Sequence, residues 1–329
     1  MNISDIAKLA GVSSAAVSRY LNNGYLSPEK KDAIRKVIEE TGYTPSKQAQ
    51  MLRTKKTNLI GVIIPNIDSE SVARMVAGVT SILNTSGYET LLANTENNID
   101  KELSYLNIFK NNRVDGIIFV ATILTKRHRK LLKELTIPVV ILGQKSDYFP
   151  CIYHDDYHAA YDMTEQFIKG GCRRFAVIGV TKKDIAVGSG RLQGFTDACR
   201  DHKIETDPSR IKIGPFSMQS GYDNAALLLA AYPDTDALFC LTDQIATGAV
   251  TYLKEAGISI PDQVSVCGFG HSRTSRVITP ALTTVHFYYR TCGENGATLL
   301  LSLLQKKDIP VKSIQLNYEI VVCDSIRHS

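Results

Sequence analysis

Residues 3–22 read ISDIAKLAGVSSAAVSRYLN, and this stretch predicts two short helices joined by a tight turn. Four apolar residues recur at i, i+3, i+4 and i+7 and so share one face of the first helix: Ile3, Ile6, Ala7 and Ala10. Gly11 can supply the positive φ of the turn, and the Ser13 hydroxyl can accept from the free N–H groups of the next helix. The stretch is therefore predicted to form a helix-turn-helix.

The second predicted helix has one face that packs and one face that does not. Val17 and Leu21 point back toward the first helix. The residues left facing outward are Ser14, Ala15, Ser18, Arg19 and Asn22. A helix that presents small and hydrogen-bonding side chains together with one arginine fits the major groove of DNA.

The charge distribution supports DNA binding by the N-terminal piece. Residues 1–57 carry ten Lys and Arg against five Asp and Glu, and the whole chain of 329 residues carries 38 against 33. The entire excess of positive charge therefore lies before residue 58. Binding to phosphates needs such a local excess, because neutralised phosphates release counterions. A solvated basic face is the alternative interpretation of the charge taken alone.

A third helix completes the N-terminal piece. It is predicted from Pro28 to about Thr41, with Ser27 as its capping hydroxyl and Gly42 as its end. Residues 1–45 then form a three-helix DNA-binding head.

Residues 46–57 are predicted to be a hinge segment. A helix this short is unstable alone in water, so we expect it to form only when something holds it. Two hinges packed together on DNA would offer Leu52 to the minor groove, where apolar side chains unstack base steps. The hinge residues expected at DNA are Lys47, Gln50 and Leu52. A plain charged linker is the alternative.

From residue 58 onward, short β-rich runs alternate with helical stretches. The strand-like runs are residues 59–64, 89–92, 116–120, 138–142, 175–179, 237–241 and 264–269. Continuously apolar strands separated by amphipathic helices indicate parallel sheets covered on both faces. The predicted fold class is α/β, with two doubly wound parallel-sheet subdomains like those of periplasmic sugar-binding proteins.

The two subdomains are expected to share the core of residues 58–329. The N-terminal subdomain is placed at about 58–156 and 286–311, and the C-terminal subdomain at about 157–285 and 312–329.

Ligands of open α/β sheets bind beyond the carboxyl ends of the strands, and here two such ends face each other across a cleft. Polar and aromatic residues of the loops at these ends suit a polyhydroxylated ligand, because they offer paired hydrogen bonds and stacking faces. The candidate effector-binding residues are Asn66, Asp68, Thr122, Gln144, Asp184, Arg191, Asp243, His271 and Tyr289. Ordinary loop or helix-cap bonds are the alternative for each of them.

The sequence gives little support to an enzyme, a metal site or a cofactor. The run His154-Asp155-Asp156 with His158 could bind a metal, yet it also fits an ordinary strand end and helix cap. A Gly-x-Ser-x-Gly nucleophile elbow in strand-turn-helix context is absent. We therefore expect no catalytic residue, no metal and no cofactor.

Composition excludes several other classes of protein. No run of about 18 apolar residues and no secretory signal pattern occurs, so we expect a cytoplasmic protein without a membrane partner. The seven cysteines are scattered and never spaced as Cys-x-x-Cys, which argues against disulfides and zinc.

The N-terminal piece carries the motifs Ser4-Asp5-Ile6-Ala7, Ala10-Gly11-Val12-Ser13, Val17-Ser18-Arg19-x-Leu21-Asn22, Gly42-Tyr43-x-Pro45 and Ala49-x-x-Leu52. These motifs resemble the head and hinge of the lactose-repressor (LacI) family. The resemblance extends over nearly the whole chain. It implies base reading by Ser14, Ala15 and Arg19, phosphate contacts near Ser13 and Ser18, and intercalation by Leu52. It also implies effector contacts by Arg191 and Asp243.

Residues 184–195 resemble the corresponding segment of disaccharide-sensing members of this family, particularly the sucrose and trehalose operon repressors. Asn66 and Gln144 stand where members that sense trehalose 6-phosphate use arginines, and amides cannot offer a phosphate the charge-assisted fork of an arginine. The resemblance thus favours a sucrose-type disaccharide, its phosphate or a fructoside.

The expected function is allosteric repression of a carbohydrate-utilisation operon. The partners would be operator DNA, a sugar or sugar phosphate between the two core subdomains, and a second copy of the chain in a homodimer. Control by trehalose 6-phosphate or by a phosphorylated co-regulator protein is the alternative, and a sugar-binding receptor without DNA function is a more distant one.

Overall fold

The computed structural model describes residues 1–22, 24–44, 56–112, 114–305 and 312–327. It divides into two compact units, Met1–Thr57 and Asn58–Ser329. Most of the expected hinge lies outside the described residues.

The first unit is a three-helix head. Its helices are α1 (Ile3–Leu9), α2 (Ser14–Leu21) and α3 (Pro28–Thr41). Ile6, Val17 and Ile34 are fully buried at its centre. Each helix thus contributes a residue to a single small core. This confirms the predicted helix-turn-helix and its third helix.

The ends of the head helices follow the sequence signals with one exception. The Ser13 hydroxyl accepts from the N–H of Ala16 at 3.2 Å, and Gly11 has a φ of 64° in the turn. Gly42 ends α3 in the left-handed conformation. Ser27 is the N-cap residue of α3, which begins on Pro28 as predicted, but the expected capping bond from the Ser27 hydroxyl is absent.

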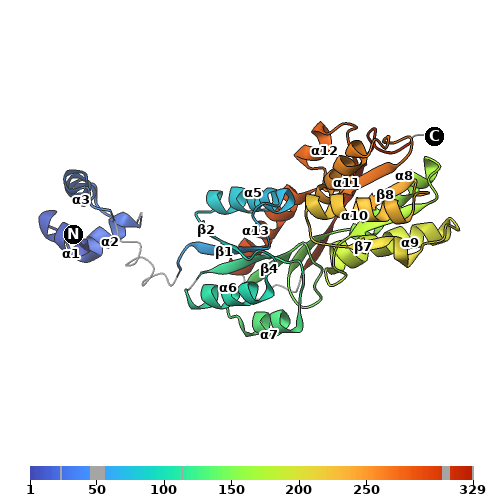
Figure 1. Ribbon diagram of the computed structural model, residues 1–329. Coiled ribbons are helices and arrows are strands. Elements are labelled where there is room, and N and C mark those ends of the chain that lie inside the picture. The colour runs from blue at the N-terminus through green and yellow to red at the C-terminus, as the bar shows by residue number, and fades with distance from the viewer. Residues whose placement is uncertain (23, 45–55, 113, 306–311, 328–329) are drawn as a thin grey trace. The chain divides into compact units, whose positions relative to one another are not determined.

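The second unit contains two sheets (Figure 1). In the first, the described strands are β1 (Leu59–Ile64), β2 (Glu89–Asn94), β3 (Gly116–Val120), β4 (Val139–Leu142), β5 (Cys151–His154) and β11 (Ser313–Leu316), in the order β11-β5-β4-β3-β1-β2. All neighbouring pairs are parallel. Helices α5 (Glu70–Thr85) and α13 (Tyr289–Gln305) cover one face, and α6 (Ile99–Asn111) and α7 (Lys126–Glu134) cover the other.

The second sheet repeats this plan. Its described strands are β6 (Phe175–Gly179), β7 (Ile211–Ile213), β8 (Ala237–Cys240), β9 (Ser265–Phe269), β10 (Thr283–Phe287) and β12 (Tyr318–Val321), in the order β12-β10-β9-β8-β6-β7. Only the edge strand β12 is antiparallel to its neighbour. Helices α8 (Asp156–Lys169) and α9 (Arg191–Asp201) cover one face, and α10 (Met218–Ala231) and α11 (Asp243–Glu255) cover the other.

Smaller elements complete the second subdomain. A π-helical turn spans Ile185–Gly190, a 3₁₀ turn spans Pro208–Arg210, and the short helix α12 spans Arg273–Val277. The first of these leads directly into α9.

The chain passes between the sheets after β5, after β10 and between β11 and β12. We expected it to return to the C-terminal subdomain at residue 312, but β11 pairs with β5 from Ser313 opposite Cys151 to Leu316 opposite His154. The return therefore comes at Tyr318, where β12 begins. This boundary depends on strand pairing across more than 150 residues, which a local pattern does not encode.

Candidate functional site

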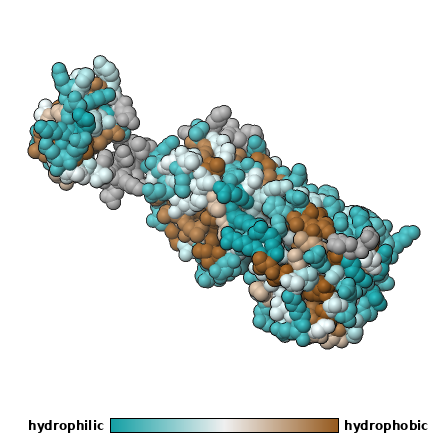
Figure 2. Space-filling model, turned by 90° about the horizontal axis from the view of Figure 1, so that it is seen from above, coloured by the Kyte–Doolittle hydropathy of each residue, from teal (hydrophilic) through white to brown (hydrophobic). Residues whose placement is uncertain are grey.

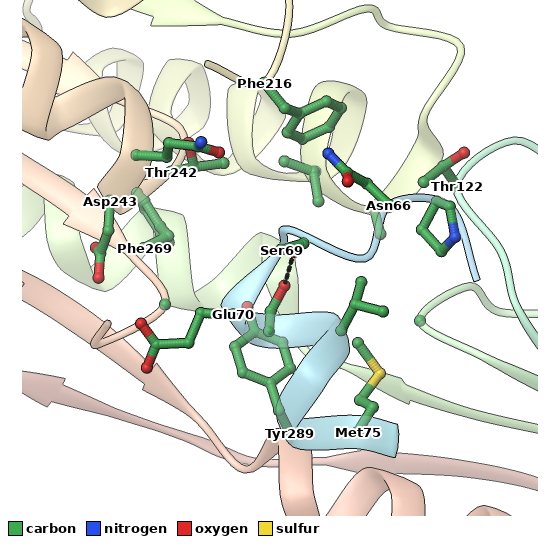
Figure 3. Close-up of a pocket in the computed structure, with 18 of the residues that line it drawn as sticks. Asn66, Ser69, Glu70, Met75, Thr122, Phe216, Thr242, Asp243, Phe269 and Tyr289 are labelled. Carbon is green, nitrogen blue, oxygen red and sulfur yellow. Dashed lines mark hydrogen bonds between the residues drawn. The ribbon is translucent and has the colours of Figure 1, made fainter. Parts of the chain in front are cut away.

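A cavity of about 320 Å³ lies where the carboxyl ends of the two sheets meet. Its volume falls within the range of about 300–1,000 Å³ that is usual for small-molecule sites. The structure brings eight of the nine candidate effector residues to its wall: Asn66, Asp68, Thr122, Gln144, Asp184, Arg191, Asp243 and Tyr289. Figure 3 shows Asn66 and Thr122 on one side and Thr242 and Asp243 on the other.

Strand ends position these side chains. Asn66 follows β1 and Thr122 follows β3 in the first sheet, and Asp243 begins α11 just after β8 in the second. Tyr289 begins α13, where the chain crosses between the subdomains. Parallel strands end at the same edge of a sheet, so loops far apart in sequence converge there.

Arg191 is held inside the wall by the protein itself. Its Nε donates to Oδ1 of Asp156 at 2.7 Å, and its Nη1 donates to the carbonyl oxygen of Leu241 at 2.6 Å. The guanidinium carbon lies 4.9 Å from the ring centres of both Phe269 and Phe287. The side chain is therefore a fixed, buried part of the wall, and α8 and α9 are joined through this ion pair.

Asp184 and Gln144 form a hydrogen bond across the cleft. The Gln144 amide donates to Oδ1 of Asp184 at 2.8 Å, and the same oxygen accepts from the N–H of Val187 at 3.0 Å. Gln144 follows β4 in the first sheet and Asp184 precedes the π-helical turn of the second subdomain. Burial raises the pKa of Asp184 to about 6, against the opposing effect of these two donors.

Asp243 is also engaged by protein donors. Its Oδ2 accepts from the N–H of Ser272 at 2.6 Å, and its Oδ1 accepts from the Thr284 hydroxyl. Burial raises the pKa of this carboxyl above its ordinary value. Asp243 thus anchors the loop between β9 and α12 to the floor of the cavity.

A second set of bonds crosses the cleft from α5. Arg74 donates through Nη1 to the carbonyl of Gly270 at 3.2 Å and through Nη2 to that of His271 at 2.8 Å. Glu70, which pairs with Arg74, accepts from the N–H of Arg273 at 2.9 Å. Arg74 and Glu70 thus connect α5 to the loop that leads into α12, and we call this pair of residues the clasp.

His154 lies on the wall of the cavity. From the sequence, it was expected either at a strand end or in a metal site. It is 7% exposed and lies 5.1 Å, between ring centres, from both Phe287 and Tyr289. Burial lowers its pKa to about 4, so the imidazole is neutral at pH 7. Its Nε2 has no hydrogen-bond partner within the described part of the chain.

Comparison with known proteins gives two family matches. Residues 2–46 match the model described as bacterial regulatory proteins, lacI family, and residues 164–326 match a periplasmic binding protein-like domain. The sucrose operon repressor of Staphylococcus xylosus is 34% identical over 313 residues, covering 95% of this chain and 97% of that protein. The chain belongs to the LacI family.

Other relatives agree with this assignment. Catabolite control protein A of Priestia megaterium is 30% identical over 97% of both chains. The structure of the lac repressor dimer bound to operator and the anti-inducer ONPF has a TM-score of 0.89 at 22% identity, covering 99% of this chain and 98% of that one, and supports the fold. The LacI family consists of transcription regulators and not of enzymes.

In this LacI-family chain the head presents the expected face of α2. Ser14, Ala15, Arg19 and Asn22 are exposed and Ser18 is half-buried, whereas Ala16 and Val17 face the core. Ser13 is exposed at the start of the helix, where it caps. Lys47, Gln50 and Leu52 lie outside the described residues.

His271 is not on the cavity wall, contrary to the sequence expectation. It has a φ of 46°, and its Nδ1 lies 3.1 Å from Nδ1 of His286. The backbone turns at Gly270, so the N–H of Ser272 reaches Asp243 while the imidazole contacts strand β10. Its neighbours Gly270 and Ser272 line the cavity instead.

Sequence reasoning missed the apolar wall residues. Phe216 precedes α10 and Phe269 ends β9, and both face the cavity together with Met75 of α5 (Figure 3). Phe269 carried a usable signal, since it is the last residue of a predicted strand. Phe216 lies in a connection that no strand or helix pattern marks.

Across the described ranges, no helix is long and apolar enough to cross a membrane. The same ranges hold no group of three His, Cys, Asp or Glu residues that could hold a metal ion.

Proposed function

We propose that this chain represses a carbohydrate-utilisation operon and that a sugar bound in the cleft controls its affinity for the operator. The observation that carries the proposal is the cavity of about 320 Å³, whose polar wall comes from both subdomains of one chain that also has a helix-turn-helix head. A sucrose-type disaccharide is favoured, in keeping with the name of the Staphylococcus xylosus relative.

The contacts across the cleft suggest how a sugar acts. Two sets of hydrogen bonds join the subdomains. Gln144 donates to Asp184, and Arg74 and Glu70 of α5 bond to the loop that leads into α12. A ligand that touches both subdomains changes the balance between their arrangements only through its different affinity for each. The affinity for the operator then depends on the sugar, if the two arrangements of the subdomains position a pair of heads differently.

The DNA-bound form would be a homodimer. Two heads related by a twofold axis match a pseudopalindromic operator, and the expected hinge segments would meet between its half-sites. Ser13, Ser14, Ala15, Ser18, Arg19 and Asn22 are the proposed contacts from the head, and Lys47, Gln50 and Leu52 those from the hinge.

Fluorescence anisotropy of a labelled operator tests the proposal. The operator is selected from random duplexes with the full-length protein, and its Kd is measured with and without sucrose, trehalose, fructose and their phosphates. We expect at least one neutral sugar or sugar phosphate to change Kd by about 5–150-fold. A Kd unchanged by all of them would reject control by a sugar.

The same measurement separates the alternatives. Trehalose 6-phosphate as the sole active compound would favour the corresponding alternative effector. An effect of a phosphorylated co-regulator protein without any sugar effect would favour that form of control. A chain that binds sugars but selects no duplex would be a receptor.

A further inference from the structure

Two histidines of the second subdomain bond to each other beside the cleft. Nδ1 of His271 lies 3.1 Å from Nδ1 of His286, and the ring centres are 5.2 Å apart with an angle of 84° between the ring planes. His271 follows β9, His286 lies in β10, and both are half-buried. Two ring nitrogens form a hydrogen bond only if one carries the proton and the other presents a lone pair. The bond therefore requires at least one neutral ring.

The backbone of His271 depends on its contacts. Its φ of 46° lies in the left-handed region, which residues other than glycine seldom adopt. Its N–H donates to the Thr284 hydroxyl at 3.3 Å, and its carbonyl oxygen accepts from Nη2 of Arg74 at 2.8 Å. The bond to His286 ties its side chain to β10. These contacts together hold a turn that the chain would otherwise not favour.

This turn carries part of the cavity wall. Gly270 and Ser272, on either side of His271, line the cavity. The N–H of Ser272 donates to Oδ2 of Asp243 at 2.6 Å, and the N–H of Arg273 donates to the clasp residue Glu70 at 2.9 Å. A shift of His271 would therefore move the wall and break bonds that join the two subdomains.

Charged and titratable groups from several elements face the histidine pair. They are Arg74 of α5, Asp243 of α11, Arg276 of α12, Glu319 of β12, and Tyr288 just after β10. Burial is the main cause that lowers the pKa of both His271 and His286 below the ordinary 6.5, the arginines lower it further, and the carboxylates oppose this. Both rings are therefore mainly neutral at pH 7.

Acid removes the bond between the two rings. One added proton still leaves a donor and an acceptor, but a second leaves two cations whose Nδ1 atoms both carry hydrogen. We propose that His271 and His286 are positioning residues that hold the loop between β9 and α12 against the cleft at neutral pH, and that protonation of both rings releases this loop. The release would occur whatever ligand fills the cleft.

The direction of the pH dependence follows from the same groups. The bonded loop takes up protons at these rings less readily than an ordinary histidine does, so it loses stability relative to the released loop as pH falls below 6.5. Acidification would then weaken the binding of any ligand that depends on this part of the wall.

Amide hydrogen exchange of the full-length protein tests the proposal. Exchange of a peptide containing Ser272 and Arg273 is measured by mass spectrometry at pH 5.0 and 7.5, and each rate is divided by that of the unstructured peptide. We expect protection to fall at least about tenfold at the lower pH. A peptide from β3 is the internal reference and should keep its protection. Equal protection of the loop at both pH values, or an equal fall in β3, overturns the proposal.

Variants assign the effect to the two rings. His271→Asn tolerates the positive φ and keeps a hydrogen-bonding side chain that cannot ionise, so its loop should stay protected at both pH values. The same fall as in wild type would assign the pH dependence to another group, such as Asp243, and overturn the proposal.

His286→Val removes the partner of His271 and suits a strand. Its loop should have at pH 7.5 the low protection that the wild type has at pH 5.0, and full protection would overturn the positioning role. His202→Asn is the matched control, because His202 is exposed and pairs with Glu165 far along the chain from this loop. It should reproduce the wild-type pH dependence.

Discussion

The amide of Gln144 donates to Oδ1 of Asp184 at 2.8 Å and joins the ends of the two sheets across the cleft. The acceptor is a buried carboxyl that also caps a π-helical turn leading into α9. One hydrogen bond therefore connects the first subdomain to the helix that carries Arg191. A ligand placed between these residues would contact both subdomains at once.

The Asp184 carboxyl should make stability depend on pH. Its pKa is about 6 in the folded chain and 3.8 ordinarily, so the folded chain binds this proton more tightly. Its stabilising contribution is therefore complete below pH of about 4 and is lost as pH rises through about 6. Asp184→Asn keeps an oxygen for Gln144 and Val187 but cannot ionise. We expect the free energy of unfolding of the variant, relative to wild type, to increase by about 1–3 kcal/mol between pH 4 and 7.

Urea unfolding followed by circular dichroism at several pH values measures this difference, and other titrating groups cancel between the two proteins. A difference that is independent of pH would show that Asp184 titrates normally.

The buried pair of Arg191 and Asp156 should behave as a unit. Arg191→Ala leaves the Asp156 carboxylate buried without its counter-ion, which costs about 3–5 kcal/mol. The double variant with Asp156→Ala removes the charge as well, so we expect it to lose less stability than the sum of the two single variants. Urea unfolding of all four proteins checks this, and strictly additive losses would contradict it. Loss of a sugar response in Arg191→Ala must therefore be interpreted together with its stability.

The clasp of α5 should control closure of the cleft. Arg74→Met removes both bonds to the carbonyls of Gly270 and His271 while it keeps an apolar stem. We expect the Kd of the effector to rise about 3–30-fold, because the closed arrangement becomes less populated. Calorimetric titration measures this, with Arg290→Met as the control, since Arg290 forms an exposed ion pair within α13. Equal Kd values for Arg74→Met and wild type would exclude a role for the clasp.

Arg19 should carry operator discrimination. It is exposed on α2 outside the core of the head, so Arg19→Ala should leave the melting temperature unchanged. We expect it to weaken operator binding by about 1–3 kcal/mol and to change binding to a scrambled duplex much less. Anisotropy with both duplexes checks this, and Arg35→Ala on α3 is the matched control. An equal loss on both duplexes would show that Arg19 contacts only phosphates.

The sequence predicted the head and seven of the described strands because their signals are local. Ile6 and Val17 are set by helical periodicity, Gly11 by a positive φ, and the buried strands by continuous apolar runs. The strands that it missed include β7, β11 and β12, which are short and only partly buried. Such segments look like loops until a partner strand is known.

The positions of the loop residues around the cavity could also be predicted, since parallel strands end at one edge of a sheet. What each side chain does there could not. Arg191 is bound by Asp156, 35 residues away, and Asp243 is bound by Ser272 and Thr284, so neither is simply a free contact for a ligand.

The sequence by itself determined the class of protein, because capping, periodicity and charge excess act over a few residues and can be recognised in a string of letters. Only the tertiary structure decided which charges are neutralised, that Nε2 of His154 lacks a donor, and that the imidazole of His271 faces His286 instead of the cavity. Those outcomes depend on which distant residue lies within about 3 Å, because hydrogen bonds and ion pairs lose most of their strength beyond contact distance.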